Sequence, residues 1–165
     1  MDDTAAPVAT SLLAALVIKQ GVGLGTLTAA QRELALAIAA CSLPVAAAEG
    51  VSEAEVNQAL KRCLQAEGAF LSTDHVELRR WLVDSGHWRR DGYGRRYERV
   101  PLAELLPERA EALRALAGLD LPAWVATQRA RHAERRDARR QAWVAQQGQQ
   151  GQPGRIVQEQ GARVG

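Results

Sequence analysis

The stretch "DHVELRRWLVDSGHWRRDGYGRRYERV", residues 74–100, carries the strongest fold signal in the chain. Asp74 followed by an acid three positions later predicts a helix start, and Gly86 predicts the left-handed residue that ends this helix. Two short arms follow, His87–Arg90 and Arg95–Val100, on either side of a turn that contains two glycines. The pattern therefore predicts a helix over 74–85 and then a β-hairpin.

Within the hairpin, the side chains expected to pack inward are Trp88, Tyr97 and Val100. A tight turn requires backbone with positive φ, which glycine adopts at little cost. We therefore expect Gly92 or Gly94 to take that conformation.

Two more helices are predicted upstream of this stretch. Thr28 with Gln31, and Ser52 with Glu55, have the spacing of a capping box, in which two side chains satisfy backbone donors at a helix start. Pro44 ends the first of these helices. The apolar side chains that recur at helical spacing, and that we expect to be buried, are Val56, Leu60, Leu78 and Leu82.

The order helix, helix, helix, hairpin over residues 28–100 is that of a winged-helix domain, a three-helix core with a two-stranded wing. The predicted fold class is thus mainly α with a small β-hairpin (α+β). Residues 1–27 are expected to form an N-terminal helix and a glycine-rich turn, and residues 101–147 a C-terminal helical extension. Residues 148–165 include "QQGQQGQPG", a low-complexity composition that predicts disorder.

Charge is distributed unevenly along the chain. Residues 1–60 hold two basic against six acidic residues, a net charge of −4, and residues 61–165 hold nineteen against thirteen, a net charge of +6. Such asymmetry points to a polyanion facing the C-terminal part, although an arginine-rich composition is equally explained by a biased genome.

Cys41 and Cys63 lie inside apolar helical patterns, without Cys or His at metal-ligand spacing. Buried free thiols in a reducing compartment are the expectation. The start Met1-Asp2-Asp3 has the wrong charge for a signal peptide, and the apolar run 8–18 is too short to span a bilayer. We expect a soluble, cytoplasmic protein without membrane contact.

A series of short motifs runs through residues 51–99: Ser52, Glu55-Val56-Asn57, Leu60-Lys61-Arg62, Asp74, Leu78-Arg79-Arg80, Leu82-Val83-Asp84, Gly86, Arg90-Asp91-Gly92 and Tyr97. In this order the motifs resemble the pattern of a bacterial family, domain of unknown function 2087. The resemblance implies a compact winged-helix-like module, and relatives joined to repressor domains imply a link to transcription.

Two interpretations of the arginines remain open. In a DNA-associated protein, the wing would touch the backbone of duplex DNA and the third helix would enter the major groove. Alternatively, the arginines pair with nearby acids, Arg79 or Arg80 with Glu77 or Asp84 among them, and have no nucleic-acid role. The candidate nucleic-acid contacts are Arg89, Arg90, Arg95, Arg96, Arg99 and Tyr93 on the hairpin, with Arg79 and Arg80 on the third helix.

The C-terminal helix carries six arginines over residues 129–140, flanked by Trp124 and Trp143. Phosphate binding and a solvated helix paired through Glu134 and Asp137 are both consistent with this pattern. The two tryptophans suggest docking, onto this chain's own core, a second copy or a protein partner. A protein-interaction module that binds no nucleic acid is therefore the alternative function.

No catalytic or metal-binding pattern stands out. The histidines His75, His87 and His132 lack the spacing of a zinc site and the neighbours of a nucleophile. We expect neither enzymatic activity nor a metal or small-molecule cofactor.

Overall fold

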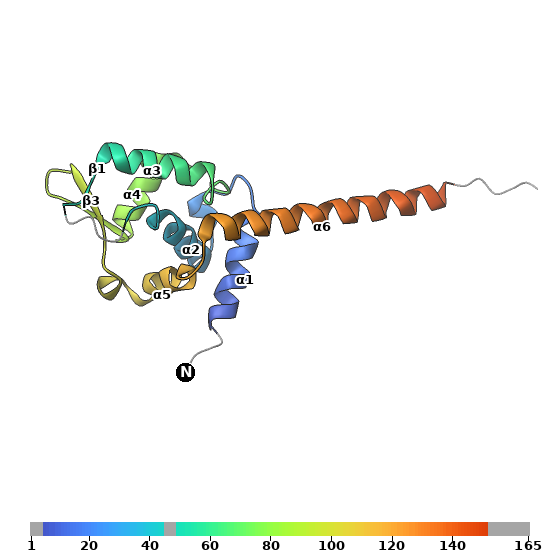
Figure 1. The fold of residues 1–165 in the computed structure, drawn as a ribbon, viewed down its shortest axis with the longest axis horizontal. Coiled ribbons are helices and arrows are strands. Elements are labelled where there is room, and N and C mark those ends of the chain that lie inside the picture. The colour runs from blue at the N-terminus through green and yellow to red at the C-terminus, as the bar shows by residue number, and fades with distance from the viewer. Residues whose placement is uncertain (1–4, 45–48, 152–165) are drawn as a thin grey trace, which may run out of the picture. The chain divides into compact units, whose positions relative to one another are not determined.

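A computed structural model describes residues 5–44 and 49–151. The chain divides into two compact units, and Ala130 is the last residue of the first. In the order of Figure 1, the elements are the helices α1 (Ala5–Val17), α2 (Ala29–Ala40), α3 (Glu53–Gln65), α4 (His75–Asp84), α5 (Pro107–Leu116) and α6 (Leu121–Gln150), the strands β1 (Val51–Ser52), β2 (Trp88–Arg90) and β3 (Arg96–Arg99), and the 3₁₀ turns Leu24–Thr26 and Leu102–Glu104.

The predicted helix starts are confirmed in atomic detail. The Thr28 and Ser52 side chains both complete capping boxes, with Gln31 and Glu55 as their partners. At the start of α4, Asp74 Oδ1 accepts hydrogen bonds from two backbone amides, at 2.8 Å each. These interactions satisfy amides that a helix start leaves without partners, so local chemistry sets where the three central helices begin.

The sheet is antiparallel and has the order β1-β3-β2. The hairpin pairs Trp88 with Arg99 and Arg90 with Tyr97, as the two predicted arms require. Strand β1, which pairs Val51 with Tyr97, was not predicted. Two residues are too few to show an alternating pattern, and this pairing is made with a strand far along the chain.

The hairpin turn confirms the predicted backbone conformation at one glycine. Gly94 has φ 69° and Gly86, after α4, has φ 78°. Asp91 closes the turn, because its Oδ1 accepts from the backbone amides of Arg95 and Arg96 at 2.7 and 3.2 Å. The tip of the wing is thus held by its own backbone and by one aspartate.

The core lies between α2, α3, α4 and the inner face of the sheet. The four residues predicted to be buried, Val56, Leu60, Leu78 and Leu82, are fully enclosed. Trp88 is buried too, and its Nε1 donates to the carbonyl oxygen of Ala40 at the end of α2. Residues 28–99 therefore make a mostly helical α+β domain with the element order of a winged helix (Figure 1).

The two cysteine thiols differ in their exposure to solvent. Both are free, but Cys63 is buried whereas Cys41 is exposed. The prediction of two buried thiols is wrong for Cys41, since this residue is the C-cap of α2, where the helix ends at the surface. Burial raises the pKa of Cys63 to about 11.

Helices α1 and α5 pack on α2 and extend the core beyond the winged-helix elements. Helix α6 continues to Gln150, past the predicted boundary at residue 147, and residues 152–165 of the predicted disordered tail lie outside the described residues. Within the described part of the chain, no helix is both long and apolar enough to cross a membrane.

Candidate nucleic-acid interface

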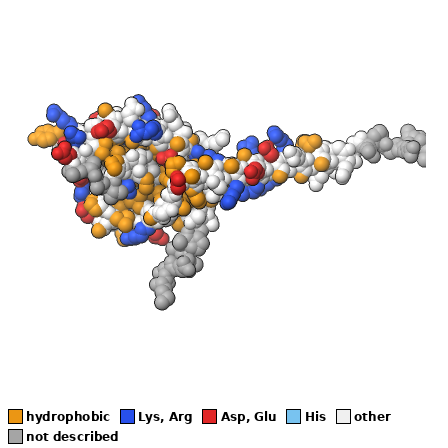
Figure 2. Space-filling view, in the orientation of Figure 1, with side chains coloured by type: hydrophobic (Ala, Val, Ile, Leu, Met, Phe, Trp, Pro, Cys, Tyr) orange, Lys and Arg blue, Asp and Glu red, His pale blue; other side chains and the backbone are white. Residues whose placement is uncertain are grey.

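The tip of the wing presents basic side chains to solvent. Arg90, Arg95 and Arg96 are exposed, and so is Tyr93, with 87% of its surface accessible. Within the described residues, none of the three arginines has a carboxylate within ion-pair distance. Hydrogen bonds from Ser52 lower the pKa of Glu55, and the charge of Arg96 acts in the same direction. Backbone hydrogen bonds lower the pKa of Asp91, and the charge of Arg95 acts in the same direction. Figure 2 shows basic side chains at the edge of the first unit near strand β3 of Figure 1.

Arg89, unlike Arg90, Arg95 and Arg96, is paired with carboxylates. Its Nε lies 3.0 Å from Glu98 Oε1 on the facing strand, and its Nη1 lies 2.6 Å from Glu104 Oε2 in the turn that follows the sheet. The guanidinium therefore bridges two carboxylates, and Arg89 ties the wing to the segment leading into α5.

Arg99 also has a structural role. It is half-buried at the end of β3, and its Nη1 donates to the carbonyl oxygen of Leu43 at 3.3 Å. This bond satisfies a carbonyl shortly after α2. Of the five wing arginines proposed as contacts, Arg89 and Arg99 are thus engaged within the protein.

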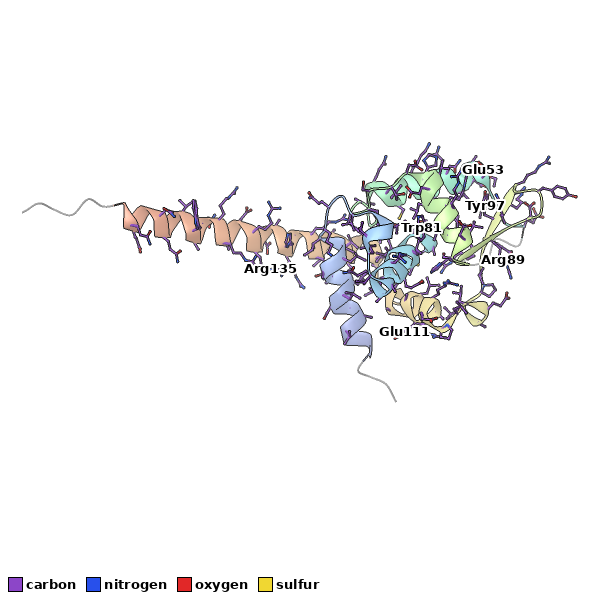
Figure 3. All side chains as sticks on the ribbon, turned by 180° about the vertical axis from the view of Figure 1, so that it is seen from behind. Glu53, Trp81, Arg89, Tyr97, Glu111 and Arg135 are labelled. Carbon is purple, nitrogen blue, oxygen red and sulfur yellow. The ribbon has the colours of Figure 1, made fainter. Side chains whose placement is uncertain are left out.

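The Arg79 side chain points from α4 toward α3, and not toward solvent. Its Nη1 donates to Asn57 Oδ1 at 2.7 Å and lies 3.0 Å from Glu53 Oε1, both on α3. Its guanidinium also stands over the ring of Tyr97, 5.7 Å from the centroid. Glu53 and Tyr97 are labelled close together in Figure 3. The predicted internal partners, Glu77 and Asp84, are replaced by residues of a neighbouring helix.

The outward face of α4 carries Glu77, Arg80 and Asp84, all exposed and spaced three or four residues apart. Glu77 accepts a hydrogen bond from Thr73 Oγ1 at 2.9 Å. Two carboxylates against one guanidinium leave this face with a negative charge. Such a helix face repels the phosphates on either side of a major groove.

The comparison with known families adds one match. Residues 28–99 match the model of a family described as an uncharacterized protein conserved in bacteria (DUF2087). The match shows that this segment, which is less than half of the chain, is similar to that family. The match begins at the N-cap of α2 and ends with β3, so it covers the three central helices and the whole sheet. No curated protein and no solved structure matches the chain.

A buried polar cluster, absent from the sequence predictions, lies at the base of the wing. The His87 side chain is fully enclosed, its Nδ1 is 2.7 Å from Ser85 Oγ, and its Nε2 is 3.6 Å from Glu33 Oε2 on α2. Arg109 Nε approaches the same carboxylate oxygen to 3.8 Å from α5. Nothing in the spacing of these residues along the chain indicated that they would meet.

The charges in this cluster follow from its burial. Desolvation lowers the pKa of His87 to about 4, and the positive charges of Arg109 and Arg99 act in the same direction. Desolvation also raises the pKa of Glu33, whereas Arg109 lowers it. Near neutral pH the imidazole is therefore uncharged, and the contact between His87 and Glu33 is not an ion pair despite its short distance.

The tryptophans beside the Arg-rich segment have different environments. Trp124 packs against the core of the first unit, whereas Trp143 is 61% exposed. Arg129, the first of the arginines, donates to the backbone oxygens of Val17, Ala66 and Glu67, where α1 and α3 end. It therefore caps two helices.

Further along α6, Arg140 pairs with Asp137 at 3.2 Å, as the solvated-helix interpretation predicted. Both side chains of this pair are largely exposed.

Proposed function

We propose that the winged-helix-like domain of residues 28–99 is a DNA-associated module that binds the backbone of duplex DNA with the tip of its wing. The observation that carries this proposal is the group of three exposed arginines, Arg90, Arg95 and Arg96, around Tyr93. Guanidinium groups bind phosphate through two parallel hydrogen bonds, and arginines that are not engaged by carboxylates bind phosphate without first breaking an ion pair.

The proposed contact is with the backbone and does not depend on base sequence. The face of α4 that would enter a major groove carries Glu77 and Asp84 beside Arg80, and Arg79 is held by α3. Phosphate contacts supply affinity and position, whereas base contacts supply specificity. A regulatory role would then require specificity from a partner or from another part of the assembly, and we propose no catalytic step.

The test is a titration of a fluorescent duplex with the full chain at two salt concentrations, comparing the wild type with the triple variant R90A/R95A/R96A. If each arginine contacts one phosphate, the slope of log affinity against log salt should flatten by about 0.9 per contact, or about 2.7 in total. Duplexes of unrelated sequence should give similar affinities.

A matched control variant removes three positive charges from a part of the surface outside the wing. Lys61, Arg62 and Arg114 are exposed, and none of them is in an ion pair with a described residue. The variant K61A/R62A/R114A should keep most of the salt slope. Equal losses in both triple variants would mean that net charge alone, and not the wing, drives the binding. A wild type without salt-sensitive affinity for any duplex would refute the proposal.

A further inference from the structure

A groove of about 1020 Å³ runs between α1, α2 and α5 in the first unit. Most of the side chains that line it are aliphatic. Two of these side chains, Val8 and Leu106, are 65% and 54% exposed. Large aliphatic side chains with this much accessible surface, gathered in a hollow, are typical of a surface that binds another molecule. In Figure 2, hydrophobic side chains gather over the part of the body where α2 and α5 lie.

The rim of this groove is acidic. Glu108 and Glu111 are exposed lining residues of α5, and no ion pair links either of them to a described side chain. Glu111 is labelled on the outer side of α5 in Figure 3. Glu33 and Arg109 also line the groove, but Arg109 lies beside the Glu33 carboxylate, which faces His87 as well. The two exposed glutamates therefore leave the rim with a net negative charge. An apolar occupant with positive charges at its edge therefore complements the groove, and an anionic one is disfavoured.

The chain itself contains a segment with that chemistry. In the second unit, α6 exposes Trp143 by 61% and Val144 by 56%. Arg140 precedes them by one helical turn and Arg136 by two, so the four side chains share one face of the helix. Among the residues that the structure describes, Arg140 pairs only with Asp137, at a solvent-exposed position where an ion pair adds little stability.

We propose that two copies of this chain form a reciprocal dimer in which the α6 end of each copy, residues 136–144, docks in the α1/α2/α5 groove of the other. An amphipathic helix laid in an apolar groove, with its large side chains as anchors, is a common mode of recognition. Trp143 is the anchor, because a buried tryptophan contributes more binding free energy than most other residues. The reciprocal arrangement makes the contact twice and closes the assembly at two copies.

Charge disfavours the two simpler pairings. Residues 131–150 of α6 carry five arginines against two acids, so two α6 ends side by side would repel each other. Two grooves placed face to face would bring Glu108 and Glu111 of both copies together, with the same result. Only the contact of groove with helix joins opposite charges, and it does not depend on whether the wing binds DNA.

The experiment measures the mass of the full chain by light scattering after size exclusion, with single variants and their mixture. The wild type should give twice the chain mass of 17.9 kDa. Trp143→Ala removes the helix anchor, and Leu106→Glu places a charge in the groove, so each variant alone should be monomeric. Mixing the two should restore part of the dimer, because a mixed pair keeps one intact groove and one intact helix end.

Controls separate this effect from loss of folding. Leu102→Glu changes a hydrophobic residue that is 42% exposed but does not line the groove, and Tyr93→Ala removes an exposed aromatic ring at the wing tip. Both should remain dimeric, and circular dichroism should show all four variants folded. A monomeric wild type would overturn the proposal. Monomeric single variants whose mixture stays monomeric would overturn it in favour of a like-with-like pairing.

Discussion

Replacing Arg79 by Ala tests the conclusion that this arginine is structural although its neighbour Arg80 is not. The Arg79 side chain is only 15% exposed, and it bonds Asn57 at 2.7 Å and stands over Tyr97. A hydrogen bond from a charged donor contributes about 1.5–3 kcal/mol, and a cation–π contact about 0.5–1 kcal/mol. Glu53 is half exposed, so its ion pair with Arg79 adds little.

We therefore expect R79A to lower the free energy of unfolding by about 2–4 kcal/mol. The variant R80A changes the adjacent, exposed arginine and should alter it by no more than about 0.5 kcal/mol. Urea denaturation of the full chain measures both, and the midpoint should fall for R79A with the slope unchanged. The double variant N57A/R79A should cost less than the sum of the single ones, because the two residues share one interaction.

The reasoning is refuted if R79A and R80A have equally small effects on stability while R79A lowers affinity for duplex DNA. That result would mean that, in solution, the Arg79 side chain does not bond to α3 but is exposed on α4, where it contacts DNA. A loss of stability without a loss of affinity is the expected combination.

Three further predictions concern the core, the turn and the buried histidine. Leu82→Ala should lower the free energy of unfolding by about 2–5 kcal/mol in the same urea assay, since the side chain is fully enclosed; a change below about 1 kcal/mol would contradict the packing described. Gly94→Ala should cost about 1–2 kcal/mol, because φ is 69° there, and Gly92→Ala, without positive φ, should cost much less. Since the folded-state pKa of His87 is about 4 against 6.5 ordinarily, the unfolded chain binds the proton more readily in this range, and stability should fall as pH decreases from 6.5 to 4. His87 itself should contribute no more than about 3 kcal/mol to this fall, and the raised pKa of Glu33 acts in the opposite direction. The fall should be weaker in His87→Gln, and an identical pH dependence in both proteins would refute this prediction.

The features that could be predicted from sequence are local ones. The caps at Thr28, Ser52 and Asp74 join residues two or three positions apart, so their chemistry is visible in a short window of sequence. The glycine in the hairpin turn and the apolar side chains of α3 and α4 are visible for the same reason. Strand β1 and the cluster around His87 could not be predicted, because they join segments that are distant along the chain.

The sequence by itself determined where helices start, where the hairpin turns and that basic residues crowd the wing. Only the tertiary structure decided what each arginine does. Arg79 and Arg80 are identical and adjacent, yet one is held by α3 and the other faces solvent. On a helix, successive side chains point about 100° apart. Whether either direction meets a carboxylate, an amide or water depends on the packing of α3, the sheet and α4 against one another, which no short window of sequence contains.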